Sequence, residues 1–154
     1  MQLRVSQMPG WRIAGISHRG SYERISETFV KLFPFAEALG LTPEQAAGAL
    51  YVAVYYDDST RTPVEQLRSL AGVTVTGDSL IAELEEERMS AGRYARTTFI
   101  GPHTQLGRAW ARFGCLCHDA GYTRQPGASY EVYVKTDPRT APDQARTDLY
   151  HPIS

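Results

Sequence analysis

The sequence has only two cysteines among its 154 residues, Cys115 and Cys117. Two cysteines cannot build a disulfide scaffold, so we expect a protein of the reducing cytoplasm. No apolar run reaches the roughly 18 residues of a membrane span, and the N-terminus lacks the apolar core of a signal peptide. Basic and acidic residues nearly cancel, at 16 against 17. With no net positive field, we expect neither direct nucleic-acid binding nor a membrane partner.

Motifs for metals, cofactors and nucleophilic catalysis are also missing. The two cysteines lie two positions apart on an expected helix and point to different faces, and no second pair exists. Asp57 and Asp58 lie in a loop without further ligands at metal spacing, so capping of a turn explains them better. The glycines form no phosphate-binding loop, and the four histidines lack a Ser or Cys partner in a known motif. We therefore expect neither a metal nor a cofactor.

Aromatic residues are plentiful, with nine Tyr, five Phe and two Trp. The hydrophobic share of 42% and the charged share of 21% are ordinary for a folded globular protein. Tyrosines in this number suit a core, and they also suit the wall of a pocket with polar tips.

The chain repeats itself at an offset of 81 residues. Gly20 and Gly40 fall on Gly101 and Gly121, and the apolar positions between these glycines match as well. The matched pairs are Ile25 with Leu106, Phe29 with Trp110, Leu32 with Phe113, Ala36 with Cys117, and Leu39 with Ala120. This spacing is that of one helix face, and each helix ends at a glycine suited to a left-handed C-cap. We infer a duplication.

Each unit reads as strand, helix, strand, strand. We expect strands at about 11–18, 50–56 and 68–76 in the first unit and at about 92–100, 129–135 and 146–152 in the second. The helices are expected at about 21–39 and 103–120, and Pro34 should kink or break the first of them. The sequence thus predicts one α+β domain over 1–154, made of two βαββ repeats, about 1–77 and 91–154, joined by the acidic segment 78–90, a linker or sheet edge. We expect antiparallel sheets, both helices on one side, and a ligand groove at the pseudo-twofold axis between the units.

Glu131 is the most informative polar residue. Alternation along the strand places it on one face with Tyr133, and places Val132 and Val134 on the other face, under the helix. Glu131 and Tyr133 would then line the groove. A carboxylate on a central strand is costly unless it has a partner or a use. The alternative is an exposed strand glutamate in a cross-strand pair.

Tyr51 holds the repeat-equivalent position of Glu131 at an offset of 80, and Tyr55 shares its face. A carboxylate framed by tyrosines suits a hydrophobic cation, which would gain charge pairing and cation–π contact. For each tyrosine taken singly, packing is the better explanation.

Two stretches resemble a known signature. Residues 52–58, VAVYYDD, followed by residues 62–68, TPVEQLR, are similar to the signature of GyrI-like proteins. Weaker support comes from GSY at 20–22, GRYA at 92–95 and YEVY at 130–133. This family includes bacterial DNA gyrase inhibitory proteins and the effector-binding domains of AraC-type and MerR-type regulators. The resemblance implies duplicated βαββ units of the SHS2-like kind, in agreement with the repeat found above.

The resemblance also implies a site. Family members bind small, often cationic or amphipathic molecules in the groove between the units, and the glutamate that matches theirs is Glu131. Tyr22, Trp110 and Tyr133 fall where pocket walls are expected. One departure is Ser69-Leu70, where gyrase inhibitors tend to carry an acidic residue. That departure weakens the case for gyrase inhibition but not the case for the fold.

These observations predict a GyrI-like protein that binds a small effector, drug or toxin, and the resemblance adds modulation of DNA gyrase. The first expected strand begins within about ten residues of the start, so we expect a stand-alone domain without a preceding DNA-binding domain. We expect binding rather than catalysis. The alternative is hydrolysis of strained electrophiles, with Glu131 as general base on a water and a tyrosine hydroxyl steering the product. A second alternative is a protein–protein interaction module with an unliganded groove.

Overall fold

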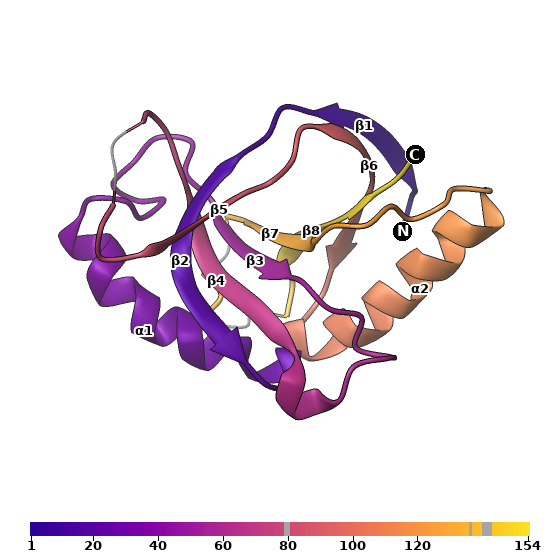
Figure 1. Ribbon diagram of the computed structural model, residues 1–154, viewed down its shortest axis with the longest axis horizontal. Coiled ribbons are helices and arrows are strands. Elements are labelled where there is room, and N and C mark those ends of the chain that lie inside the picture. The colour runs from indigo at the N-terminus through magenta and orange to yellow at the C-terminus, as the bar shows by residue number, and fades with distance from the viewer. Residues whose placement is uncertain (79–80, 136, 140–142) are drawn as a thin grey trace.

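The computed structural model describes residues 1–78, 81–135, 137–139 and 143–154. Within them, eight strands form one antiparallel sheet that carries both long helices on one side (Figure 1). The strands are β1 (Arg4–Met8), β2 (Arg12–Arg19), β3 (Tyr51–Tyr55), β4 (Arg68–Val75), β5 (Glu85–Arg88), β6 (Gly92–Ile100), β7 (Ser129–Val134) and β8 (Arg146–Pro152). The helices are α1 (Ile25–Ala38) and α2 (Leu106–Asp119), and short 3-10 turns are η1 (Tyr22–Arg24), η2 (Val64–Gln66) and η3 (His103–Gln105). None of these helices is both long and apolar enough to cross a membrane.

The strand order is symmetric about its centre. The sheet runs β1-β6-β8-β7-β3-β4-β2-β5, so β6-β8-β7 of one repeat meets β3-β4-β2 of the other. β3 and β7 pair at the junction, with Ala53 opposite Glu131 and Tyr51 opposite Tyr133. The predicted α+β fold with antiparallel pairing and one long helix per unit is confirmed. The β3–β7 pair joins the strands of both units in one continuous sheet.

Two outer strands, β1 and β5, complete the sheet. β1 pairs with β6 of the second repeat, and β5 pairs with β2 of the first. At the offset of 81, Arg4 matches Glu85, so β1 and β5 hold equivalent positions in the repeat. Each pairs with a strand of the other unit. β5 lies inside the acidic segment 78–90, of which residues 79–80 lie outside the described residues. The division into about 1–77 and 91–154 stays a prediction.

Both helices end in the same way. Gly40 and Gly121 have φ values of +72° and +82°, a left-handed conformation that glycine adopts without strain. Backbone bonds from Leu41 N–H to Ala36 O and from Tyr122 N–H to Cys117 O close the two ends. Before that end, α1 continues through Pro34 as one helix, so it does not break there.

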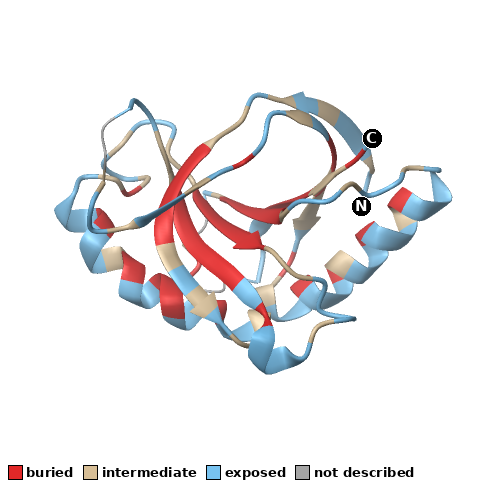
Figure 2. Cartoon of the chain, in the orientation of Figure 1, coloured by how far each residue is buried: buried red, intermediate tan, exposed pale blue. Residues whose placement is uncertain are grey.

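The sheet is buried on both faces. On the helix face, Phe29 and Leu32 of α1 pack on Tyr51 and Tyr133, and Phe113 of α2 packs on the second unit. The other face holds a cluster that includes Ile13, Val52, Val54, Leu70, Tyr94, Tyr130, Val132 and Tyr150. β3 is buried along its whole length, and the buried positions of both helices face the sheet (Figure 2).

The predicted assignment of faces is wrong. Tyr133 packs against Phe29 of α1, so it lies on the helix face, and Val132 lies in the cluster on the opposite face. Alternation separated the two sets of residues correctly. It could not say which set lies under the helices, because both faces of the central strands are apolar and buried.

Candidate functional site

Glu131 lies at the centre of the molecule, on the helix face of β7. It is 3% exposed and stands opposite Ala53 of β3. Because alanine ends at its Cβ atom, the space above β3 at this point is left to the glutamate and its aromatic neighbours.

Three side chains from three elements donate hydrogen bonds to the carboxylate. The hydroxyls of Tyr55 on β3 and Tyr133 on β7 each donate to Oε1 over 2.7 Å. The indole Nε1–H of Trp110 on α2 donates to Oε2 over 2.5 Å. Among the described residues, no cation forms an ion pair with Glu131. The carboxylate is thus held by neutral donors only.

Burial and hydrogen bonding act on this carboxyl group in opposite directions. Burial raises the pKa of Glu131, and the hydrogen bonds from Tyr133, Tyr55 and Trp110 counteract part of that increase. The pKa values of Tyr55 and Tyr133 lie well above the ordinary value, first because of burial and then because of the adjacent carboxylate. Both hydroxyls therefore remain protonated donors. A positive charge is the one favourable partner that this arrangement lacks.

Five of the six residues predicted for the site lie together. Glu131, Tyr133, Tyr55 and Trp110 form the hydrogen-bonded cluster described above. Tyr22 borders it, with its ring centroid 4.5 Å from that of Tyr55 and its hydroxyl bonded to backbone atoms of residues 57 and 68.

Tyr51 lies apart from this cluster. It shares the helix face but packs edge-to-face on Phe29, at 6.0 Å between ring centroids. Its hydroxyl is buried without a hydrogen-bond partner among the described residues, and burial raises the pKa of this phenol to about 12. No hydrogen bond links Tyr51 to Glu131, so it belongs to the surroundings of the site.

Two histidines border the cluster although the sequence analysis gave them no role. The ring of His103 lies 5.3 Å from that of Tyr133, and His151 lies 5.0 Å from Trp110. Burial lowers the pKa of both, that of His151 to about 3, so both are neutral at pH 7. His103 could have been found from the repeat, because it is the mate of Tyr22 at the offset of 81.

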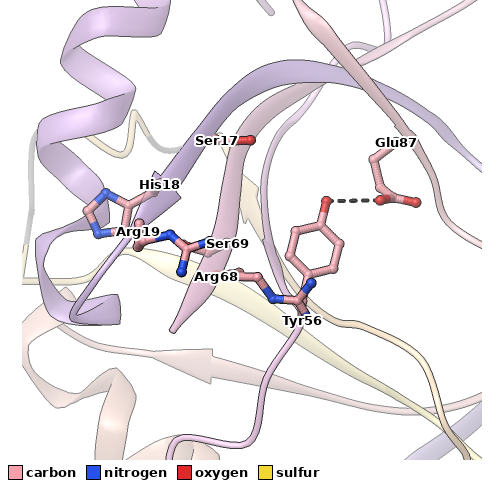
Figure 3. A pocket seen from close by; sticks show the side chains of 7 residues that line it. All are labelled: Ser17, His18, Arg19, Tyr56, Arg68, Ser69 and Glu87. Carbon is pink, nitrogen blue, oxygen red and sulfur yellow. Dashed lines mark hydrogen bonds between the residues drawn. The ribbon is translucent and has the colours of Figure 1, made fainter. Parts of the chain in front are cut away.

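The Glu131 cluster is closed in this structure. A ligand that reaches the carboxylate must displace one of the aromatic donors, and Trp110, which is only partly buried, is the most accessible of them. An open hollow of about 400 Å³ lies elsewhere, at the end of β2, where Arg19, Tyr56, Arg68 and Glu87 line it (Figure 3).

The chain is similar to known proteins over most or all of its length. The model of the family described as "GyrI-like small molecule binding domain" matches residues 1–154. A DNA gyrase inhibitor from Escherichia coli strain K12 is 27% identical over 140 residues, which cover 87% of this chain and 86% of that relative. One from Escherichia fergusonii is 28% identical over 140 residues, with 87% of each chain covered.

Solved structures share the fold at low sequence identity. SAV2435 bound to tetraphenylphosphonium has a TM-score of 0.73 at 13% identity, over 100% of this chain and 94% of that one. A hydrolase from Listeria innocua has a TM-score of 0.66 at 13% identity, over 99% and 92% of the two chains. The C-terminal domain of EcmrR has a TM-score of 0.69 at 13% identity, over 99% and 97%.

Proposed function

Because the chain belongs to the family of GyrI-like small molecule binding domains, we propose that its ligand is a hydrophobic cation held by Glu131. One observation carries this proposal: a carboxylate that is 3% exposed has three neutral donors and no ion-pair partner among the described residues. A buried charge without a counter-charge is unfavourable, and a ligand cation would remove that penalty.

The neighbouring rings determine which cations fit. Tyr55 and Trp110 contact the carboxylate and pack edge-to-face on one another, and Tyr22 packs on Tyr55. Aromatic faces beside the carboxylate would attract a desolvated cation. A small hydrated ion gains little from such walls, whereas a cation carried on aromatic groups gains both contact area and charge pairing. The ligand of SAV2435, tetraphenylphosphonium, is a cation of this kind.

Binding of tetraphenylphosphonium to the purified protein, measured by calorimetry, tests the proposal. Glu131→Gln preserves the shape of the side chain and removes its charge, so affinity should fall about tenfold or more, since a hydrogen bond or contact to a charged group contributes about 1.5–3 kcal/mol. Glu65→Gln, at an exposed position on η2, is the matched control and should bind as the parent does. Triphenylphosphine oxide, a neutral analogue, should bind parent and Glu131→Gln alike. Equal tetraphenylphosphonium affinity of the parent and Glu131→Gln would show that the carboxylate is not the site.

The names of the relatives favour a second role. Proteins that are 27–28% identical over 140 residues are named DNA gyrase inhibitors, so we propose that this chain modulates DNA gyrase. A supercoiling assay with purified gyrase tests this, and adding tetraphenylphosphonium shows whether ligand and gyrase activities are linked. Unchanged supercoiling at a large excess of the protein would contradict it.

Hydrolysis fits the site less well. Three donors already occupy the carboxylate of Glu131, so a water could approach it for activation only by displacing one of them. The Listeria hydrolase is 13% identical and shares the fold alone.

A further inference from the structure

The last part of β2 is an uncovered sheet edge. β5 pairs with β2 only from Arg12 to Gly15, whereas β4 pairs with it through Arg19. On the β4 side, Gly20 N–H donates to Leu67 O, and Arg68 O accepts from the N–H of Tyr56, the residue that follows β3. Arg19 and Arg68 therefore form a non-hydrogen-bonded pair of the antiparallel ladder. The backbone N–H and C=O groups of Arg19 point away from β4, to the uncovered side.

The same edge already binds one carboxylate. The backbone N–H of Ser17 points to the uncovered side as well, and it donates to Oε2 of Glu85 over 2.9 Å. The Ser17 hydroxyl also donates to this oxygen. No described residue bonds the backbone N–H of Arg19, two positions further along. An unpaired edge of this kind can accept another strand.

Two hollows flank this edge, and both are lined by Ser17, His18 and Arg19. The first, of about 400 Å³, contains Tyr56 and Arg68 and lies largely on the face opposite the helices (Figure 3). The second, of about 310 Å³, lies beside α1 and is lined in part by Arg24, Thr28 and Lys31. Side chains of an added strand alternate between the two faces of a sheet, so they would enter the two hollows in turn.

Two cations at this edge have no ion-pair partner among the described residues, although Asp57 and Glu85 add their carboxylates to those that line the hollows. The lining residues include four cations, Arg19, Arg24, Lys31 and Arg68, and two carboxylates, Glu27 and Glu87. Arg24 pairs with Glu27, Arg68 pairs with Asp57, and Glu87 accepts a hydrogen bond from the Tyr56 hydroxyl. Among the described residues, Arg19 and Lys31 form no ion pair. Arg19 also stands directly opposite Arg68, whose own ion-pair partner is Asp57, so an added anion would give Arg19 a counter-charge of its own.

We propose that the open end of β2 binds an extended acidic segment of a partner protein as an added strand. The backbone of that segment pairs with the Arg19 N–H and C=O groups, and its carboxylates meet Arg19 in one hollow and Lys31 in the other. A second copy of this chain is a poor occupant, because edge-to-edge pairing would bring two sets of these cations together.

The repeat supplies a matched control. Ile100 at the end of β6 is the mate of Arg19, and Gly101 N–H donates to Ala145 O as Gly20 N–H does to Leu67 O. β1 pairs with β6 only as far as Arg96, so Ile100 also lies on an uncovered edge. Ile100 is 61% exposed and carries no charge. An acidic strand should therefore prefer the β2 end.

The experiment uses the full chain and a fluorescein-labelled peptide of sequence TEVEVET, followed by fluorescence anisotropy. Arg19→Pro removes the outward N–H together with the guanidinium, without breaking a hydrogen bond among the described residues, and should weaken binding about tenfold. Ile100→Pro removes the outward N–H of the control edge and should leave the affinity unchanged. Arg19→Glu and Lys31→Glu should each weaken binding, which keeps the proposal testable if Arg19→Pro fails to fold by circular dichroism.

Two further probes separate this proposal from its competitors. The peptide TKVKVKT has the same strand-forming pattern and should not bind. Single-stranded DNA should not displace TEVEVET. Binding of TEVEVET that is equally strong in Arg19→Pro and Arg19→Glu, competition by DNA at similar concentration, or no binding at about 1 mM peptide would each overturn the proposal.

Discussion

The carboxyl group of Glu131 keeps its proton to a higher pH than an exposed glutamate does, because burial disfavours the charged form. The unfolded chain releases this proton near pH 4.5, whereas the folded protein releases it at higher pH. Between the two pKa values the folded state binds more protons, so the free energy of unfolding should fall as the pH rises through this window and then level off. Urea denaturation of the parent against Glu131→Gln measures this contribution, since the variant lacks it. A difference between the two proteins that does not change with pH would contradict the assignment.

His151 should act in the opposite direction. Its pKa is lowered from 6.5 to about 3, because burial beside Phe113 and Trp110 disfavours the imidazolium ion. Between these values the unfolded chain binds the proton and the folded one does not, so stability should be lost as the pH falls from about 6.5 towards 3. His151→Phe should show a shallower decline over this range. Part of the decline should remain, because burial also lowers the pKa of His103.

Phe29 and Trp110 are repeat mates whose structural roles have diverged. Phe29 is buried between Tyr51 and Tyr133, whereas Trp110 is partly buried and donates to Glu131. Phe29→Ala should therefore lower the free energy of unfolding by about 3–5 kcal/mol. Chemical denaturation measures this loss, and a loss under about 1 kcal/mol would mean that the packing of this helix face is misread. Trp110→Ala should lose less stability and should weaken tetraphenylphosphonium binding instead.

At the scale of elements, α1 carries a proline in an exposed part of its interior. Pro34 has no N–H to bond the carbonyl of Val30, and such a position costs about 3 kcal/mol in an otherwise regular helix. Pro34→Ala should thus raise the free energy of unfolding, by up to about 3 kcal/mol in urea denaturation. Glu37→Ala, at another exposed position of α1, should change it by about 0.5 kcal/mol or less. A destabilised Pro34→Ala would contradict this account of the proline.

The sequence predicted the inner six strands and both helices because their apolar periodicity is strong. It did not predict β1, and it left β5 as a linker or edge. Both are largely exposed, and RVSQM and EEER carry no alternating apolar pattern. They form strands because β6 and β2 would otherwise have uncovered edges. An outer strand can form without an apolar pattern of its own, because the neighbouring strand supplies its hydrogen-bond partners.

The candidate site was predictable in composition but not in geometry. Period-two alternation brought Glu131, Tyr133 and Tyr55 to one face, and the structure joins them by hydrogen bonds. The side of the sheet was not readable, since Val52 and Val132 on the other face are as deeply buried as Tyr133. The bond from Trp110 depends on the position of α2 over β7, a tertiary feature that no local pattern records.

At the scale of the whole molecule, the two repeats contact one another at several points. β3 pairs with β7, β1 and β5 each pair with a strand of the other repeat, and Tyr133 of the second repeat packs on α1 of the first. Neither repeat can unfold without exposing the apolar surface and strand edges of the other. The structure therefore favours a single cooperative unit over two independent halves.

The two tryptophans allow this cooperativity to be measured from both faces of the sheet. Trp11 packs against the cluster opposite the helices, and Trp110 lies beside Glu131 on the helix face. In Trp110→Phe the tryptophan fluorescence comes from Trp11 alone, and in Trp11→Phe it comes from Trp110 alone. Within each variant, the urea transition by tryptophan fluorescence should coincide with that by far-UV circular dichroism, even though Trp110→Phe shifts the midpoint by removing a donor to the buried carboxylate. If fluorescence in either variant changes at a lower urea concentration than circular dichroism, the region around the remaining tryptophan unfolds separately, which would contradict a single cooperative unit.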